Sequence, residues 1–316
     1  MAQVAADLVR RCRRNQYNRA MPGSYRFEAG EGGLERLVIS ARDAEAHIYR
    51  HGAHVTHFQP HGDQPVLWLS PRSQFQAGTP IRGGVPICFP WFGAKADDPA
   101  APSHGLVRTR QWSLIGIDEL DNGSVRASFD TEAGPLMIAH TITVGRALVM
   151  RLDIYHRGKE PVTFEAALHT YLHVSDVRRV TVAGLEDATY VDKVDGSARK
   201  KQPSGPLAIT GETDRVYLDT ESAVEVHDPM LGRTITIDKS GSQSTVIWNP
   251  GPSRAARMPD IGDEGWSQML CVETANVADN AIRLPPGRSQ TMIATISLWR
   301  LPAVNPPSNK MEDHAS

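Results

Sequence analysis

The sequence is short of several features that mark common classes of protein, and each shortage excludes one class. Its three cysteines, Cys12, Cys88 and Cys271, have no metal-site spacing, and pairing would leave one over. This usage favours a reducing compartment, so we expect a cytoplasmic protein. The apolar runs fall well short of the roughly 18 residues that a membrane-spanning helix needs, so no membrane segment is expected.

An excess of charge of one sign is also lacking. The chain has 34 basic and 36 acidic residues, which gives a formal net charge of −2 and no sign of a surface for nucleic acid. It contains no Gly-x-Gly-x-x-Gly, phosphate-binding P-loop, His-Glu-x-x-His or Cys-x-x-Cys pattern. We therefore expect no cofactor and no metal ion, and nothing implies an obligate protein partner.

The chain of 316 residues divides into three parts. Apolar residues recur at helical spacing between Val4 and Cys12, which predicts a short helix in an N-terminal extension, residues 1–25. The arginines that follow leave an organelle transit peptide as an alternative. Residues 26–301 show no break and predict one large domain. Residues 302–316 are polar and rich in proline, so we predict a disordered tail.

What the sequence has in quantity is short β-type segments separated by turn residues. Long helical periodicity is absent after the N-terminus, so the pattern predicts an all-β fold, an antiparallel sandwich or barrel. Two stretches rich in proline and glycine, Phe75–Ala101 and Asn249–Trp266, are predicted to be loops that shape a binding mouth. The predicted strands are 37–40, 46–49, 54–58, 66–69, 112–117, 125–130, 136–144, 147–156, 161–173, 179–183, 223–227, 234–238, 244–248, 269–273 and 290–299.

One predicted strand carries an unusual polar face. In Ala166–Val174, residues His169, Tyr171 and His173 point to one side at strand period, and aliphatic residues point to the other. Taken alone, a strand histidine is more often a structural group than a catalytic one. A second apolar run, MLCVETANV, carries the carboxylate of Glu273, which is costly to bury without a partner. We interpret His169 and Glu273 as a candidate acid/base pair, with a buried ion pair as the alternative for Glu273.

Two arginines stand in glycine-containing motifs, Arg82 in RGGVP and Arg108 in HGLVR. Two guanidinium groups in one pocket would suit a phosphate or carboxylate, because their planar donors match its oxygens. The glycines would let the backbone approach a ligand. From spacing alone, a loop-anchoring salt bridge is the favoured alternative.

Other polar and aromatic side chains are weaker candidates. His104 lies in a turn-like segment where it could contact ligand hydroxyls, and Asp214 could bind a sugar or cap a turn. The aromatic rings of Trp91, Phe92 and Trp248 could stack on a sugar, although core packing is their usual role. The cluster His51, His54 and His57 has helical spacing inside a strand pattern. It is therefore a poor candidate for a metal site.

These residues lie in a set of motifs that resembles the aldose 1-epimerase superfamily, and within it the glucose-6-phosphate 1-epimerases. The resemblance covers nearly all of residues 30–300. It rests on LWLS (67–70), IRGGVPICFPWFG (81–93), HGLVR (104–108), HTYLHV (169–174), ETD (212–214), VIWNP (246–250) and CVETANV (271–277).

The resemblance implies a large antiparallel β-sandwich, the galactose-mutarotase-like supersandwich, and a phosphorylated hexose as the substrate. It implies that His169 is the general acid and Glu273 the general base. Substrate contacts would come from Arg82, Arg108, Asp214 and His104. Some relatives have glutamine just before the His-Gly pair, where this chain has Ser103, so Ser103 is a further candidate binding residue whose shorter side chain would loosen a contact.

The expected reaction is the exchange of α and β anomers by ring opening. Glu273 as a carboxylate would remove the proton of the anomeric hydroxyl while protonated His169 donates to the ring oxygen. A nearby anion would favour the charged imidazole. Two alternatives are a mutarotase for non-phosphorylated aldoses and a non-catalytic carbohydrate-binding sandwich.

Overall fold

The computed structural model describes residues 24–262 and 264–300, and nearly all regular structure in them is β-strand. The prediction of an all-β fold with antiparallel sheets is confirmed, because the strands of each sheet pair antiparallel throughout the described residues. The N-terminal helix and the disordered tail were predicted for segments that lie almost wholly outside the described residues. The first strand, β1, begins at Tyr25.

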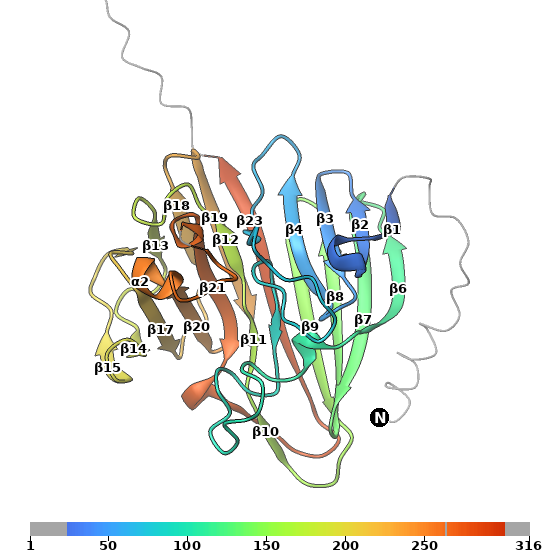
Figure 1. Ribbon diagram of the computed structural model, residues 1–316. Helices are drawn as coiled ribbons and strands as arrows, with labels where there is room; N and C mark the ends of the chain where they lie inside the picture. The colour runs from blue at the N-terminus through green and yellow to red at the C-terminus, as the bar shows by residue number, and fades with distance from the viewer. Residues whose placement is uncertain (1–23, 263, 301–316) are drawn as a thin grey trace, which may run out of the picture.

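A nine-stranded sheet forms one layer (Figure 1), with the strand order β16-β13-β18-β19-β23-β9-β8-β7-β6. Its strands are β6 (Ser113–Glu119), β7 (Val125–Ala133), β8 (Leu136–Val144), β9 (Leu148–His156), β13 (Thr181–Ala183), β16 (Leu207–Ala208), β18 (Val224–Asp228), β19 (Arg233–Ser240) and β23 (Ser289–Arg300).

An eight-stranded sheet carries the segments that contain most of the predicted site residues. Its path is β15-β14-β17-β20-β21-β11-β5, and β12 also pairs with β21. Its strands are β5 (Ile87–Cys88), β11 (Ala166–Leu168), β12 (Tyr171–His173), β14 (Thr189–Asp192), β15 (Ala198–Lys201), β17 (Thr213–Leu218), β20 (Ser244–Asn249) and β21 (Met269–Asn276).

Smaller elements complete the fold. A four-stranded sheet in the order β1-β2-β3-β4 and a two-stranded ribbon of β10 and β22 accompany the two large sheets. The strands are β1 (Tyr25–Ala29), β2 (Glu35–Ser40), β3 (Ala44–Tyr49), β4 (His54–Pro60), β10 (Val162–Phe164) and β22 (Ile282–Leu284). The helical turns are η1 (Glu31–Gly33), η2 (Val107–Thr109), α2 (Gly251–Ala255), η3 (Gly265–Gln268) and η4 (Ala278–Asn280). None of these helices is long and apolar enough to cross a membrane, a finding that concerns only the described residues.

The main core lies where the inner faces of the sheets meet. It joins Leu37 of the four-stranded sheet, Ile138 of the nine-stranded sheet, and Leu168, Leu172 and Val272 of the eight-stranded sheet. Each of these side chains is at most 1 % exposed. The aliphatic half of Ala166–Val174 therefore faces the core, as its alternation predicts.

Two of the predicted strands are wrong in extent. The segment 161–173 is divided into β10, β11 and β12, and His169 and Thr170 lie outside regular structure between the last two. The segment 66–69 forms only isolated bridges, from Leu67 to Leu172 and from Leu69 to Gly83. In both places short, irregular backbone at the rim of the site replaces a continuous strand.

Burial of uncharged histidine makes the fold sensitive to acid. His140 in β8 is fully buried, and burial lowers its pKa to about 4. The unfolded chain has a histidine pKa near ~6.5, so it binds a proton at pH 5 that the folded state rejects. The buried neutral imidazole makes its full contribution to the free energy of unfolding above the unfolded pKa. That contribution is lost as the pH falls from the unfolded pKa toward the folded pKa.

We predict that His140→Leu, which keeps a similar volume, flattens the pH dependence of the free energy of unfolding. Between pH 7 and pH 5 the wild type should lose about 2 kcal/mol more than the variant. Urea unfolding at several pH values measures this, with Met150→Leu as a packing control that should keep the wild-type slope. Parallel curves for wild type and His140→Leu would contradict the assignment.

Candidate active site

The strand register places His169 opposite Glu273. Leu168 pairs with Thr274 and Tyr171 pairs with Cys271, so the two residues between them fall opposite Glu273 and Val272. Directly opposite residues of an antiparallel pair point to the same side with Cβ atoms about 5 Å apart. In agreement, His169 Nε2 lies 3.4 Å from Glu273 Oε1.

The sheet face that carries this pair looks away from the main core. Asp214, Trp248, Cys271 and Tyr171 are paired in a row across β17, β20, β21 and β12, and Glu273 lies two residues from Cys271 on the same face. Tyr171, Trp248 and Cys271 belong to an apolar cluster separate from the main core. The predicted pair therefore lies in an apolar layer between the sheet and its covering loops.

Both members of the pair are buried. His169 is 6 % exposed and Glu273 is 1 % exposed. Neither Glu273 oxygen, nor His169 Nδ1, forms a hydrogen bond with the residues that the structure describes. Polar atoms this deep are nearly always satisfied in folded proteins, so the orphaned atoms make this pair a candidate functional site.

Burial decides the protonation state of the pair. Burial raises the pKa of Glu273 well above its usual value, and the nearby negative charge of Asp214 adds to the shift. Burial also lowers the pKa of His169 well below its usual value, helped by His104, Arg82 and Arg108. Both shifts favour the uncharged forms of the two groups in the free site. The expected reaction uses the charged forms, with Glu273 as a carboxylate and His169 protonated.

His104 approaches His169 from the loop before η2. Their ring centroids are 5.6 Å apart, and the rings meet edge to face at 72°. The Gly93 N–H donates to His104 Nδ1 at 3.2 Å, which leaves Nε2 as the proton-bearing nitrogen of the neutral ring. Burial and the two arginines lower the pKa of His104 to about 3, so it is a neutral hydrogen-bond donor at neutral pH.

Arg82 is held in place by two partners. Its Nε and Nη2 each lie 2.8 Å from Asp260 Oδ2, and its Nη1 donates to the Tyr171 hydroxyl at 2.9 Å. Burial alone would lower the pKa of Arg82, but Tyr171 and Asp260 raise it above its usual value. Asp260, in the loop before η3, is a functional neighbour that the sequence did not reveal, although that loop was predicted to shape the mouth.

Arg108 in η2 differs from Arg82 in its charge balance. Its Nη2 donates to the Ser103 carbonyl at 2.7 Å, and no carboxylate within the described residues forms an ion pair with it. Burial lowers its pKa, and the negative charge of Asp260 opposes that shift. Ser103 contributes only its backbone carbonyl to this hydrogen bond, and it is exposed to solvent.

Asp214 lies at the other side of the pair. Its Oδ2 is 3.5 Å from Arg254 Nη1, and burial raises its pKa. Arg254, in α2, also donates to Glu212 and lies 6.0 Å from the centre of the Trp248 ring. The seven predicted site residues thus share one region. Asp260 and Arg254 belong to it as well and carry no sequence signal beyond their loop.

Of the three aromatic candidates, two lie near His169 and one does not. Phe92 and Trp248 have ring centroids 6.5 Å and 6.1 Å from that of His169. Trp91 instead donates its indole N–H to the Pro102 carbonyl, and Lys95 lies over its ring. Only Phe92 and Trp248 are placed to face a ligand at the pair.

The glycines of RGGVP and HGLVR have a different role from the one predicted. A Cβ on Gly84 would collide with the Val55 carbonyl oxygen, and a Cβ on Gly105 would collide with the Phe89 carbonyl oxygen. Both residues also have positive φ, at 62° and 79°. They let the backbone approach other backbone, and so they hold the loops of Arg82 and Arg108 against the sheet.

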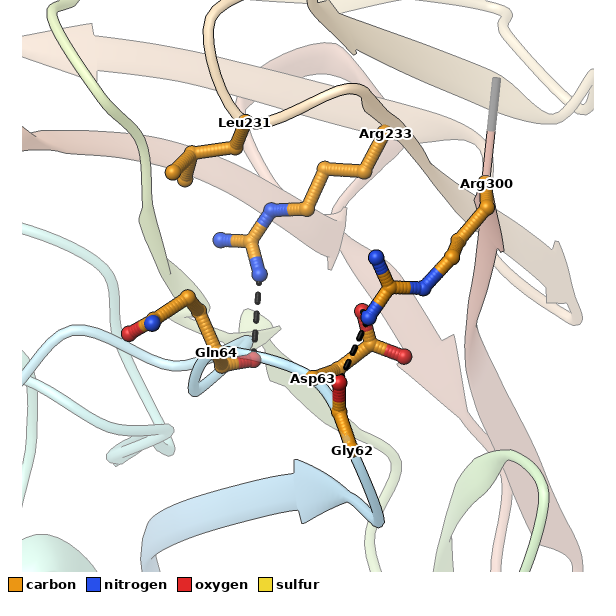
Figure 2. A pocket seen from close by; sticks show the side chains of 6 residues that line it. All are labelled: Gly62, Asp63, Gln64, Leu231, Arg233 and Arg300. Atoms are coloured by element: carbon orange, nitrogen blue, oxygen red, sulfur yellow. Dashed lines mark hydrogen bonds and ion pairs between the residues drawn. The ribbon is translucent and has the colours of Figure 1, made fainter. Parts of the chain in front are cut away.

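A pocket of about 200 Å³ lies elsewhere, at the chain segments around Asp63 and Arg300 (Figure 2). Asp63 and Arg300 form an ion pair there at 2.7 Å, and Arg233 donates to the Gln64 carbonyl at 3.1 Å. None of its lining residues is among the predicted site residues. The His169–Glu273 pair, and not this pocket, is the candidate active site.

The comparisons with known proteins agree with this geometry. The model of the aldose 1-epimerase family matches residues 35–297, and the chain belongs to that family. It is therefore an isomerase that acts on the anomeric carbon of a sugar.

A protein of Salmonella typhimurium, provisionally named glucose-6-phosphate 1-epimerase, is 36 % identical over 266 residues, covering 81 % of this chain and 88 % of that protein. One of Cenchrus ciliaris with the same provisional name is 32 % identical over 273 residues, covering 81 % and 82 %. The crystal structure of a provisionally assigned mutarotase from Salmonella typhimurium has a TM-score of 0.82 at 29 % identity, covering 93 % of this chain and 99 % of that one.

The buried Glu273 carboxyl group, which has no hydrogen-bond partner among the described residues, should lower the free energy of unfolding. A carboxyl group whose folded pKa is raised contributes stability that is complete below its unfolded pKa, near ~4.3, and is lost as the pH rises above it. We predict that Glu273→Gln, which cannot ionise, melts at least about 2–4 °C above wild type at pH 8, with a smaller gap at pH 5. Calorimetry at the two pH values measures this. A variant that melts below wild type at both would contradict the assigned burial of an unpaired acid.

Proposed function

We propose that the chain is a hexose-6-phosphate 1-epimerase and that glucose 6-phosphate is its substrate. The observation that carries the proposal is that Arg108 has no ion-pair partner among the described residues and lies with Arg82 near the His169–Glu273 pair. Arg108 is half-buried, and a half-buried cation without a carboxylate in direct contact is suited to bind an anionic ligand. The names of the relatives support a phosphorylated hexose. The cytoplasmic location and the domain limits 26–301 stay predictions.

In this proposal the substrate phosphate prepares the dyad. Burial lowers the His169 pKa in the free site, and the charges of Arg82 and Arg108 lower it further. A phosphate dianion bound to both arginines cancels that repulsion, so the pKa of His169 rises. The anomeric hydroxyl donates a hydrogen bond to Glu273 and favours its carboxylate form. The proton that the pair shares thus moves to His169 when a phosphorylated sugar is bound.

Ring opening then follows from the positions of the two groups. Glu273 takes the proton of O1 as the C1–O1 double bond forms. The C1–O5 bond breaks, and O5 takes the proton of His169 Nε2. The open aldehyde rotates about C1–C2. Ring closure returns the O5 proton to His169 and the Glu273 proton to O1, which gives the other anomer and the starting enzyme. His104 Nε2 and Asp214 are proposed to hold sugar hydroxyls during the rotation.

We predict that the wild type accelerates exchange between the α and β anomers of glucose 6-phosphate, measured by two-dimensional exchange NMR against buffer alone. Glu273→Gln and His169→Asn should each lose roughly 10²–10⁴-fold of that rate, because each removes a positioned acid/base group. Glu225→Gln, which changes a half-exposed carboxylate on the nine-stranded sheet, should keep the wild-type rate. Full activity in either dyad variant would remove that residue from its role.

The phosphate contact has a separate test. Arg108→Met should raise the KM for glucose 6-phosphate about 10–100-fold, the worth of a charge-assisted hydrogen bond, and should change activity on glucose far less. Arg126→Met, which removes an exposed ion pair with Asp118, is the matched control. An equal loss on both sugars would mean that Arg108 supports the loop and not the phosphate. No loss on either would place the phosphate elsewhere.

A further inference from the structure

The imidazole of His169 is one member of a stack of three rings. The Tyr171 ring lies parallel to it, with centroids 4.7 Å apart and an angle of 9°. The Trp68 ring lies on Tyr171 at 5.9 Å and 24°. Tyr171 is 1 % exposed and Trp68 is 5 % exposed. The stack therefore has no room to tilt without repacking its neighbours.

Trp248 closes the side of this stack. Its ring meets those of His169 and Tyr171 edge to face, each at 6.1 Å, with angles of 79° and 82°. Offset-stacked and edge-to-face contacts are the two favoured arrangements of aromatic rings. His169 needs this support because it lies between β11 and β12, where no strand fixes its direction. From the described residues, its Nδ1 has no hydrogen-bond partner that would orient the ring.

Tyr171 also touches the phosphate side of the site through its hydroxyl. That oxygen accepts a hydrogen bond from Arg82 Nη1 at 2.9 Å, while Asp260 holds Nε and Nη2 of the same guanidinium. With three nitrogens engaged, the plane of the Arg82 guanidinium is defined by Tyr171 and Asp260. Tyr171 is thus in contact with the acid/base histidine through its ring and with an arginine through its oxygen.

We propose that Tyr171 is a positioning residue with two separable tasks. Its ring sets the direction of the His169 imidazole, and its hydroxyl sets the direction of Arg82 toward the substrate phosphate. The inference rests on the proposed function, since it assigns the hydroxyl to recognition of a phosphorylated sugar. In this view Tyr171 alone sets the distance between the arginine that binds the phosphate and the histidine that acts on the sugar ring.

The two tasks separate in two variants. Tyr171→Phe keeps the ring and loses the acceptor, so the KM for glucose 6-phosphate should rise about 2–10-fold while kcat stays within about two-fold of wild type. Activity on glucose should change less than activity on glucose 6-phosphate. Tyr171→Leu loses the flat ring, so kcat should fall at least about 10-fold on both sugars, because misplaced reacting groups cost up to ~10² in rate. Tyr155→Phe, on the outer face of β9, is the control and should match wild type.

A double variant tests the route through Arg82. In an Arg82→Met background, adding Tyr171→Phe should change the KM no further, because the partner of the hydroxyl is already gone. A Tyr171→Phe variant with wild-type KM on glucose 6-phosphate, or one that loses kcat equally on both sugars, would overturn the task of the hydroxyl. If Tyr171→Leu does not fold, as seen by circular dichroism, the Phe variant and the double variant decide the question. A wild type that accelerates no anomer exchange would instead refute the proposed function.

Discussion

The site depends on one antiparallel register, that of β21 against β11 and β12. This register sets His169 across from Glu273, and it sets Tyr171 across from Cys271 two residues away. Because the side-chain period of a strand is two, a slip of the β11–β12 segment by one residue would turn His169 into the main core and away from Glu273. The aliphatic side chains of the same strands prevent that slip, since Leu168, Leu172 and Val272 fill the core only in the observed register. Core packing thus holds the reacting groups in place.

Burial then gives the pair its chemical character. The same apolar layer that shields Glu273 from water raises its pKa, and it lowers the pKa of His169. Three neighbours that carry positive charge or imidazole nitrogens, Arg82, Arg108 and His104, add to the shift on His169. Both shifts therefore favour the neutral pair in the free site. In our account the negative charge of a phosphorylated substrate changes that preference, which joins substrate recognition to catalysis by electrostatics alone.

Much of this could be predicted from residue patterns, and the failures have physical reasons. Strict alternation predicted the segment 136–144 with the observed ends of β8, because one face of that strand is buried and the other is not. Alternation also put His169 and Tyr171 on one face. It could not reveal that the chain breaks at His169, because the break is caused by contacts with other segments, such as the hydrogen bond from His169 N–H to the Pro86 carbonyl.

The sequence pattern could not predict which residues of distant loops contact the predicted site residues. Asp260 and Arg82 are 178 residues apart, and nothing near Asp260 distinguishes it from other acidic loop residues. The glycines of the motifs were predicted to let the backbone approach a ligand. In the structure they let it approach other backbone. The pairing of His169 with Glu273 came from the strand pattern, and the family resemblance added Arg82 and Arg108 as substrate contacts. The structure places the histidine beside the carboxyl group and both arginines near the histidine.

The most direct test of the account is a crystal structure with 1,5-anhydroglucitol 6-phosphate. This analogue keeps the ring oxygen and the phosphate but has no anomeric hydroxyl, so its ring cannot open. The account predicts its phosphate on Arg108 and Arg82, and its ring oxygen within hydrogen-bond distance of His169 Nε2 with C1 beside Glu273. An analogue bound with its phosphate away from both arginines, or with C1 away from the pair, would contradict the claim that one hexose 6-phosphate spans the anchor and the dyad.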